Sequence, residues 1–257
     1  MRAIILAAGR GSRLEQPAGE QLPKCLLELG GKSLLERHLL QLQAVGVTDV
    51  VLVLGFRRDL IEAALDRLGW RPRPHIVVNE QYQLGSMLSL HTAADALTGG
   101  GDVLLMDADV LYDERIMAAL AAGKGPANRV LIDRGFEPGA EPVKLCMRSG
   151  VPIELRKALA PDLEYDTVGE SIGFFRLDSI EARRLAQLVG GYIEAGRADL
   201  PHEEAVRDLL REHGRRFEVA DCTGLPWIEI DFPADVVRAA REVLPRIEAA
   251  SRAEALP

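Results

Sequence analysis

Residues 2–14 read RAIILAAGRGSRL, and Lys24 lies shortly after them. The apolar start of this stretch is typical of a buried strand, and the small turn that follows contains Gly9 and Gly11. Glycines let the backbone come close to an anion, so that its N–H groups can donate to phosphate oxygens. Arg13 and Lys24 add positive charge beside the turn. The stretch therefore predicts a polyphosphate site at the end of a core strand.

Two better-known phosphate motifs do not fit this stretch. A dinucleotide-binding fingerprint needs a third glycine where Leu14 stands, and an acidic residue at the end of the second strand. A P-loop that ended at residues 31–33 would need a glycine in place of Leu26. A plain surface turn remains the simpler alternative for residues 9–13.

The length and composition of the chain limit the classes of protein to which it can belong. With 257 residues, 47% of them hydrophobic, the chain can bury the core of one α/β domain, with or without a small lobe. A net charge of −8 argues against a nucleic-acid partner, which would require a basic surface. Cys25, Cys146 and Cys222 are far apart and odd in number, so we expect reduced thiols and no zinc site. Apolar runs all stay well short of the ~20 residues of a membrane span, so we expect a soluble, cytoplasmic protein with no membrane partner.

The first half of the chain alternates between apolar runs and amphipathic segments. Runs rich in β-branched residues indicate strands buried on both faces, and their alternation with helices indicates a mostly parallel sheet. Ligands bind such sheets at the carboxyl ends of the strands, so residues 7–13, 79–86 and 107–109 should share one rim. The expected strands are 50–54, 76–78 and 103–106, and the expected helices are 33–45, 59–68 and 86–97.

The second half is expected to pair its strands in antiparallel or mixed fashion, because short apolar runs alternate with turns rich in glycine and proline. A closing helix should start at Pro233 and continue to about residue 247, and residues 249–257 are expected to fray. The other expected elements are strands at 129–133, 143–147, 172–177, 216–219 and 227–230 and helices at 179–189 and 202–212.

The glycine-containing stretch, with Pro23 and Lys24 after it, resembles the signature of nucleotidyltransferases that join a nucleoside triphosphate to a phosphorylated acceptor. Further segments resemble later motifs of this family: MDAD at 106–109, GESIG at 169–173 and LPWIEID at 225–231. The resemblance covers nearly the whole chain, and the last segment is most similar to the phosphocholine and 2-aminoethylphosphonate cytidylyltransferase branch. It implies an α/β fold with a single GT-A-like (Rossmann-like) nucleotidyltransferase domain, whose mixed, mostly parallel central sheet carries helices on both faces. This domain would span residues 1–248, with a nucleotide-binding half at 1–120, an acceptor-binding half at 121–248 and a C-terminal tail at 249–257.

Asp107 and Asp109 follow a buried strand, where two carboxylates this close repel each other unless a cation lies between them. The resemblance assigns metal binding to Asp109, whereas a role that only braces the loop stays open for Asp107. Asp231 ends a second apolar strand and should reach the same rim. A site that combines a few protein carboxylates with substrate phosphates and water suits the octahedral coordination that Mg²⁺ prefers. We therefore expect Mg²⁺ as the cofactor, held by Asp109 and Asp231.

Arg13 and Lys24 are the expected catalytic residues, because both charges bear on the triphosphate and the departing pyrophosphate. A cytosine base would lie over Ala8 and Gly9, with Ser86 reading the base, capping the helix that follows it, or both. The full expected nucleotide site consists of Leu6, Ala7, Ala8, Gly9, Gly11, Ser12, Arg13, Lys24, Gly85, Ser86 and Asp107.

The acceptor site is less sharply marked. The resemblance assigns the acceptor phosphate to Lys157, with Lys144 as the competing cation, and the choice stays open. Aromatic faces with acids nearby hold cationic headgroups, for which Trp227, Glu170 and Glu229 are the expected contacts. Trp227 as a packing residue and Glu229 as a solvent-facing one stay open. Further candidates are Tyr82, Tyr112, Tyr165, His202, Glu203 and Glu204, whereas His38, His75, His91 and His213 are expected to be structural.

The resemblance and these residues imply transfer of a cytidylyl group from CTP to a small phosphorylated or phosphonylated acceptor, with phosphocholine or 2-aminoethylphosphonate favoured. The products would be a CDP-linked compound and pyrophosphate. An ionised acceptor phosphate needs no strong general base. Three alternatives stay open: a sugar-1-phosphate or inositol-phosphate nucleotidyltransferase, a glycosyltransferase and a non-catalytic nucleotide-binding regulator. The last would be expected to lack Asp109, Asp231 or Lys24. A homodimer is the assembly left open.

Overall fold

Strand β1 (Arg2–Ala7) lies in the interior of a nine-stranded sheet in the computed structural model, which describes residues 1–14, 21–122 and 128–254. β4 (Asp49–Leu54) and β6 (Val103–Asp107) flank β1 in parallel, and β5 (His75–Val78) continues the parallel pairing beyond β4. The carboxyl ends of these strands therefore meet along one edge of the sheet. The loops after β1 and β6 line the same cavity there.

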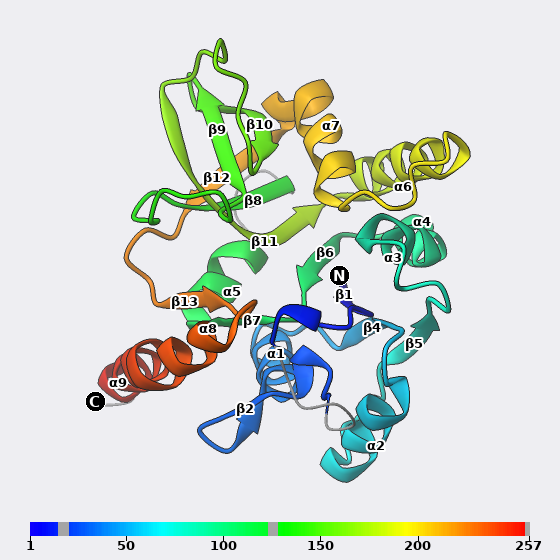
Figure 1. Ribbon diagram of the computed structural model, residues 1–257, viewed down its shortest axis with the longest axis vertical. Coiled ribbons are helices and arrows are strands. Elements are labelled where there is room, and N and C mark those ends of the chain that lie inside the picture. Colours follow the sequence, from blue (N-terminus) through cyan, green and yellow to red (C-terminus); the bar gives the residue numbers. More distant parts are fainter. Residues whose placement is uncertain (15–20, 123–127, 255–257) are drawn as a thin grey trace.

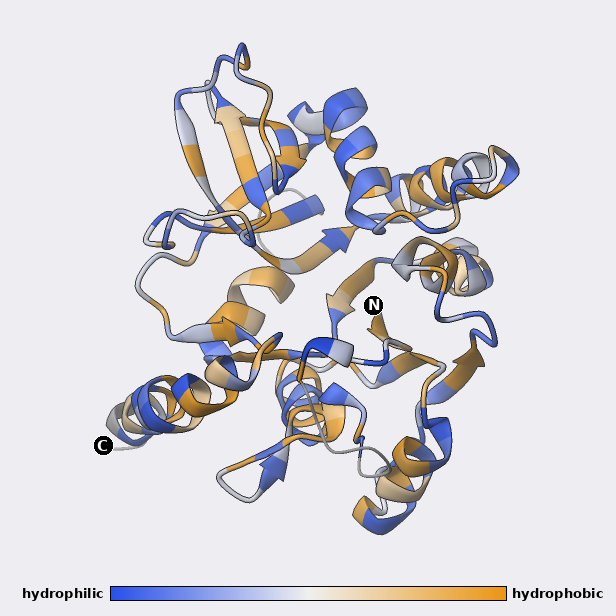
Figure 2. Ribbon diagram, viewed as in Figure 1, coloured by the Kyte–Doolittle hydropathy of each residue, from blue (hydrophilic) through white to orange (hydrophobic). Residues whose placement is uncertain are grey.

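Consecutive side chains of β1 point to opposite faces of the sheet and enter two separate cores. Ile5 is buried among helices on one face, and Ile4 is buried among helices on the other. Figure 1 shows these helices on both sides of the sheet, and in Figure 2 strands β4 and β5 are orange, as expected of strands between two layers. The first group consists of α1 (Leu34–Ala44), α2 (Arg58–Leu68) and α5 (Glu114–Ala121), and the second of α3 (Ser86–Thr92), α4 (Ala94–Thr98), α6 (Ser179–Glu194) and α7 (Glu203–His213).

The second half adds antiparallel strands around β11 (Thr167–Leu177). The first residues of β11 pair with β9 (Lys144–Arg148), its last residues pair with β6, and β8 (Asn128–Asp133) pairs along it. β10 (Val151–Arg156) forms a hairpin with β9, and β12 (Phe217–Asp221) runs parallel to β8. The main path through the sheet is β10-β9-β11-β6-β1-β4-β5. One sheet thus joins the first half of the chain to the second.

A bulge in β11 makes room for the end of β6. The pairing of β11 with β8 shifts register between Ser171 and Phe175, and Gly173 has a φ of 78°. An added Cβ at Gly173 would lie 2.5 Å from Asp107 Oδ2. Glycine is therefore required at this position both by the backbone conformation and by the neighbouring carboxylate.

A third, smaller core lies at the C-terminal end of the chain. β13 (Trp227–Glu229) pairs with β7 (Val110–Tyr112) outside the main sheet. Ile228 and Leu244 belong to this core, and the packing holds residues 227–231 against the loop that follows β6. Its helical elements are α8 (Pro233–Arg238), the π-helical η4 (Ala239–Val243) and α9 (Leu244–Glu254).

The remaining elements are short. They are the 3₁₀ turns η1 (Ser12–Leu14), η2 (Lys24–Leu26) and η3 (Gly214–Arg216), and the two-strand pair β2 (Glu28–Leu29) and β3 (Lys32–Ser33). Over the described ranges, no helix combines the length and the apolar character that crossing a bilayer requires.

The mixed, mostly parallel sheet with helices on both faces is confirmed, and so are the antiparallel pairings of the second half. Several bounds were wrong. The expected helix at 86–97 is two helices that meet at Ala93, and β11 begins at Thr167 rather than near 172. The closing helix continues to Glu254, so residues 249–254 are not frayed, and residues 255–257 lie outside the described part of the chain. Strand β10 was missed because it contains Pro152, which only an edge strand tolerates well.

Candidate active site

A cavity of ≈ 290 Å³ opens at the carboxyl ends of β1 and β6. Every residue that the sequence predicted for nucleotide binding contributes to its lining, together with Asp109. Ser89 also lines the cavity and was missed, although it lies one helical turn after Ser86 and so shares a face of α3 with it. The other lining residues are Cys25, Tyr82 and Ala108.

Glycines shape the walls of this cavity in different ways. Gly11 has a φ of 64°, and an added Cβ would lie 2.8 Å from Lys24 Cγ. An added Cβ at Gly85 would lie 2.8 Å from Asp199 O, so the chain before α7 passes directly over Gly85. At Gly9, by contrast, an added Cβ would meet nothing within 4 Å. Gly9 therefore borders open space where the backbone can face a ligand.

Lys24 lies between two carboxylates. Its Nζ is 2.7 Å from Asp109 Oδ2 and 2.6 Å from Asp231 Oδ1, while Arg13 Nη2 is 2.9 Å from Asp231 Oδ2. Burial by itself would lower the pKa of Lys24, but the two carboxylates outweigh it and raise that pKa far above its usual value. Lys24 is therefore positively charged at any physiological pH.

Asp109, Glu229 and Asp231 form an acidic cluster, in which one oxygen from each carboxylate lies within 4.8 Å of the others. The backbone brings them together, because Ile230 N donates to Asp109 O at 3.0 Å and Glu229 pairs with Val110. Desolvation by the surrounding protein, followed by repulsion from Asp109 and Asp231, raises the pKa of Glu229 to about 9. A bound cation would relieve this repulsion, and an all-oxygen donor set fits Mg²⁺. Glu229, predicted as an acceptor contact, is thus placed among the candidate metal ligands.

Asp107 lies outside this acidic cluster, at the end of β6. Its Oδ1 is 3.9 Å from Nε2 of His202, which is only 2% exposed. Burial raises the pKa of Asp107. Burial also lowers the pKa of His202, but Glu203 and Asp107 outweigh that effect and raise it to about 9. The two aspartates of the MDAD segment therefore have different partners, Lys24 for Asp109 and an imidazolium for Asp107.

The two candidate lysines of the acceptor side differ in their surroundings. Lys144 Nζ donates to backbone carbonyl oxygens of Gly139, Pro142 and Lys157, at 2.8, 3.3 and 2.6 Å. Lys157 Nζ instead lies 3.0 Å from Glu141 Oε2, an atom that is also 3.2 Å from Arg13 Nη1. Lys157 is thus connected to Arg13 through one carboxylate, whereas Lys144 holds a loop in place.

Trp227 and Glu170, the expected acceptor contacts, share a partner that was missed. Trp227 Nε1 donates to Asp133 Oδ2 at 2.8 Å, and Glu170 pairs with Asp133 across β11 and β8. Burial, and next the charge of Asp133, raises the pKa of Glu170 to about 7. Asp133 ends β8 much as Asp107 ends β6, and this common position is the signal that could have found it.

The other aromatic and acidic candidates divide between the cavity and the core. Tyr82 lines the cavity, Tyr112 is buried with its hydroxyl 3.2 Å from His38 Nδ1, and Tyr165 is exposed. Glu204 is held by Arg156, whose Nε is 2.9 Å from Glu204 Oε1.

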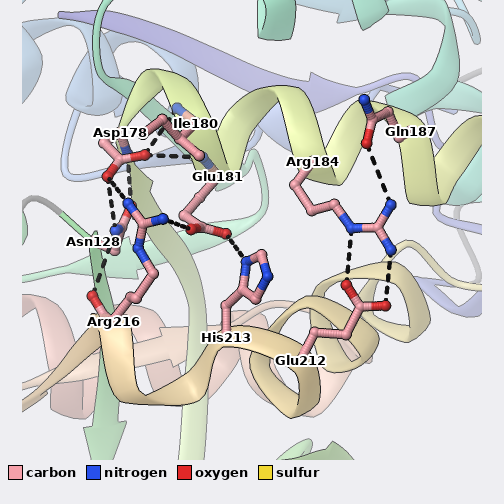
Figure 3. A network of polar contacts seen from close by, with 9 residues as sticks. All are labelled: Asn128, Asp178, Ile180, Glu181, Arg184, Gln187, Glu212, His213 and Arg216. Carbon is pink, nitrogen blue, oxygen red and sulfur yellow. Dashed lines mark hydrogen bonds and ion pairs between the residues drawn. The ribbon is translucent and has the colours of Figure 1, made fainter.

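His213, expected to be structural, lies at the far end of α7 from His202 and outside the cavity lining. Its Nδ1 is 2.7 Å from Oε2 of the fully buried Glu181, whose Oε1 is 3.0 Å from Arg216 Nη1 (Figure 3). This network joins the start of α6 to the end of α7.

Proteins related in sequence include nucleotide-transferring enzymes. The chain is 30% identical to CMP-5'-(3-aminopropyl)phosphonate synthase of Streptomyces rubellomurinus, over 91% of this chain and 37% of that protein. It is 25% identical to CTP:phosphoglutamine cytidylyltransferase of Campylobacter jejuni, over 92% of this chain and 98% of that protein. The chain thus spans little more than a third of the Streptomyces protein and nearly all of the Campylobacter protein.

Solved structures with the same fold include the inositol-1-phosphate CTP transferase of T. maritima, with a TM-score of 0.74, 21% identity and 96% of each chain covered. CTP:phosphocholine cytidylyltransferase of Streptococcus pneumoniae gives a TM-score of 0.71 at 20% identity, covering 95% of this chain and 98% of that chain. These likenesses show the fold, whereas the family follows from the sequence. The family model described as a MobA-like NTP transferase domain matches residues 3–169, and the chain therefore belongs to this family of nucleotidyltransferases.

Proposed function

We propose that the chain transfers a cytidylyl group from CTP to a small phosphorylated or phosphonylated acceptor and releases pyrophosphate. The observation that carries this proposal is the position of Lys24 between Asp109 and Asp231, beside the glycine-containing loop that lines the cavity. Binding of a triphosphate with a divalent cation requires such an alternation of cations and carboxylates. CTP is favoured among nucleotides because the names of both related proteins describe CTP use or a CMP product.

Several groups of the cavity would have roles in this reaction. The backbone around Gly9 would cradle the phosphates, and Arg13 would bind the triphosphate from the cavity edge. Lys24 would turn its ammonium group toward the triphosphate once Asp109 and Asp231 hold a metal ion. Mg²⁺ in that position would neutralise negative charge on the phosphate oxygens when bound.

The acceptor supplies the nucleophile. Its phosphate or phosphonate oxygen would attack the α-phosphorus in line, the bond from the α-phosphorus to the bridging oxygen would break, and pyrophosphate would leave. An acceptor phosphate with a second pKa near ~6 is already ionised at neutral pH, so no side chain has to remove a proton. Lys157 would orient this group, since its ammonium already lies near a carboxylate shared with Arg13.

The finer part of the proposal is an acceptor that carries an amine, with phosphocholine or 2-aminoethylphosphonate favoured. It is supported by Trp227, Asp133 and Glu170, which place an aromatic side chain and two carboxyl groups beside one another. A neutral polyol phosphate carries no cation for the aromatic face, and its hydroxyl groups could only donate hydrogen bonds to the two carboxyl groups.

A pyrophosphate-release screen tests both parts. CTP, UTP, ATP and GTP would each be combined with phosphocholine, 2-aminoethylphosphonate, phosphoethanolamine, inositol phosphate and glucose-1-phosphate in the presence of Mg²⁺. We expect the highest kcat/KM for CTP with an amine-bearing acceptor. Clear preference for inositol phosphate or glucose-1-phosphate would overturn the acceptor assignment alone, and an absence of pyrophosphate release in every combination would contradict the transfer reaction.

A further inference from the structure

His202 is a buried histidine that contacts Ser86, a residue of the cavity lining. It immediately precedes α7, and the segment 200–202 is held against the start of α3 by two hydrogen bonds. His202 N donates to Ser86 Oγ at 2.9 Å, and Met87 N donates to Leu200 O at 3.1 Å. Ser86 itself lines the cavity. Residues 200–202, far from α3 in the sequence, therefore support Ser86, the residue proposed to face the nucleotide.

The side chain of His202 makes a second contact with the same hydroxyl group. Its Nδ1 is 3.2 Å from Ser86 Oγ and 3.1 Å from Glu203 Oε2. Oε2 of Glu203 has no hydrogen-bond partner among the described residues, so Glu203 acts on the ring through its negative charge, which favours a proton on Nδ1. Nδ1 is then a donor, and the hydroxyl oxygen of Ser86 accepts from it as well as from the backbone of His202.

The other edge of the ring is oriented by charge. Nε2 of His202 has no hydrogen-bond partner among the described residues, and it faces Asp107 Oδ1 at 3.9 Å. The ring thus lies between two carboxyl groups, Glu203 on the Nδ1 side and Asp107 on the Nε2 side. This arrangement leaves the ring with donors on both edges and holds it in one orientation.

We infer that His202 is a positioning residue that determines how Ser86 presents its hydroxyl group to the nucleotide. The oxygen of Ser86 accepts hydrogen bonds from His202, so its own O–H points into the cavity as a donor. A donor there can bind an acceptor on the base edge, such as the ring nitrogen or the carbonyl oxygen of cytosine. The inference rests on the proposed use of CTP, and it adds the residue that immediately precedes α7 to the groups that position the base-binding hydroxyl.

A double-mutant cycle in CTP binding tests this inference. Calorimetry with CTP and Mg²⁺ would compare the wild type with Ser86→Ala, His202→Ala and the double variant. We expect each single change to weaken binding by about tenfold, the upper end of the effect of one neutral hydrogen bond. In the Ser86→Ala background, His202→Ala should then weaken binding by less than about threefold, because the group through which it acts is already absent.

The chain offers a matched control on the same helix. His213→Ala removes a histidine that pairs with the buried Glu181 but does not line the cavity (Figure 3). We expect it to lower Tm while the Kd for CTP stays within twofold of the wild type. Glu203→Gln is a milder second variant, which should weaken CTP binding about threefold in the wild-type background and leave it unchanged in the Ser86→Ala background; it carries the test if His202→Ala does not fold.

The outcomes separate the inference from the proposed function. If the wild type binds CTP and both His202→Ala and Glu203→Gln bind it equally well, or if the effects at positions 86 and 202 multiply fully, the positioning role is wrong. If the wild type does not bind CTP at all, the use of CTP fails, and the role of His202 in binding it fails with it.

Discussion

The nucleotide side and the acceptor side of the candidate site are built in different ways. The nucleotide side takes most of its residues from positions 6–13, whose backbone continues from β1 into the cavity. The acceptor side takes Glu170 from β11, Lys157 from the segment after β10 and Trp227 from β13. The geometry of a contiguous stretch is determined by its local sequence. The geometry of a surface built from several strands depends on how those strands pair. Changes on the nucleotide side should therefore act directly on turnover, and changes on the acceptor side should act mainly on acceptor affinity.

The largest effect is expected from the carboxylates that would hold Mg²⁺. Asp109→Asn and Asp231→Asn should each lower turnover by at least ~10²-fold, since each removes a preorganised charge. Pyrophosphate release at saturating Mg²⁺ measures this. Asp113→Asn is the matched control, because Asp113 Oδ1 accepts from Arg115 N at 3.0 Å as a cap of α5; it should lower Tm without changing turnover. Near wild-type turnover in either of the first two variants would remove that residue from the metal site.

The next largest effects are expected from Lys24 and Arg13, the two cationic residues proposed to bind the triphosphate. Lys24→Ala should lower kcat by about 10- to 100-fold and raise the KM for CTP, because the Lys24 side chain is only 15% exposed and its charge is little screened by water. Arg13→Ala should show the same pattern at about tenfold or less, since the Arg13 side chain is 47% exposed and screened by solvent. Kinetics with CTP varied at a fixed acceptor concentration distinguish them. An unchanged kcat/KM for CTP in Lys24→Ala would contradict its assigned role.

A pair of lysine variants tests which lysine binds the acceptor phosphate. Lys157→Ala should raise the acceptor KM by about tenfold through loss of one charge-assisted contact. Lys144→Ala should change that KM by less than about threefold and lower Tm instead, because its ammonium group is occupied by backbone carbonyls. Acceptor titrations at saturating CTP, together with melting curves, compare the two. The reverse pattern would assign the acceptor phosphate to Lys144.

Trp227 is expected to have a smaller effect that is confined to the acceptor. A cation on an aromatic face gains roughly 0.5–2 kcal/mol, so Trp227→Ala should raise the KM of an amine-bearing acceptor by up to about tenfold. The KM for CTP should stay nearly unchanged. Asp133→Asn should act in the same direction, because its carboxylate accepts the indole N–H. An equal loss for inositol phosphate would mean that Trp227 contributes packing alone.

The smallest expected effect is a pH dependence due to Glu170. Its pKa is raised to about 7, so the carboxyl group is mostly neutral at pH 6 and mostly charged at pH 8. Affinity for a cationic acceptor should therefore increase about threefold as the pH rises through 7, because the Glu170 carboxyl group becomes negatively charged in that direction. Acceptor KM measured from pH 6 to 8 in the wild type and in Glu170→Gln tests this. A parallel dependence in both proteins would assign the titration to the acceptor itself.

Much of the fold and of the nucleotide side was predictable from local pattern. The apolar run before Gly9 and the continuous apolar strands predicted a parallel sheet buried on both faces, and the described sheet confirms it. Such features are readable because burial on both faces and close approach to a phosphate each restrict residue type at the position itself. Asp109 and Asp231 were predicted from their positions after apolar strands and, for Asp109, from the family resemblance.

Other features were decided by the tertiary structure alone. Glu229 lies beside Asp109 because Ile230 N donates to a carbonyl more than a hundred residues away, and no local pattern encodes that hydrogen bond. Asp133 and Glu141 are ordinary polar residues in sequence, and they contact Trp227 and Arg13 only because distant segments fold together. His202 was a candidate acceptor contact, but the tertiary structure places it against Ser86. Residue type and spacing thus determined which chemistry the chain can hold, whereas long-range register determined which charges face one another, because a side chain acquires its electrostatic surroundings only when distant segments pack against it.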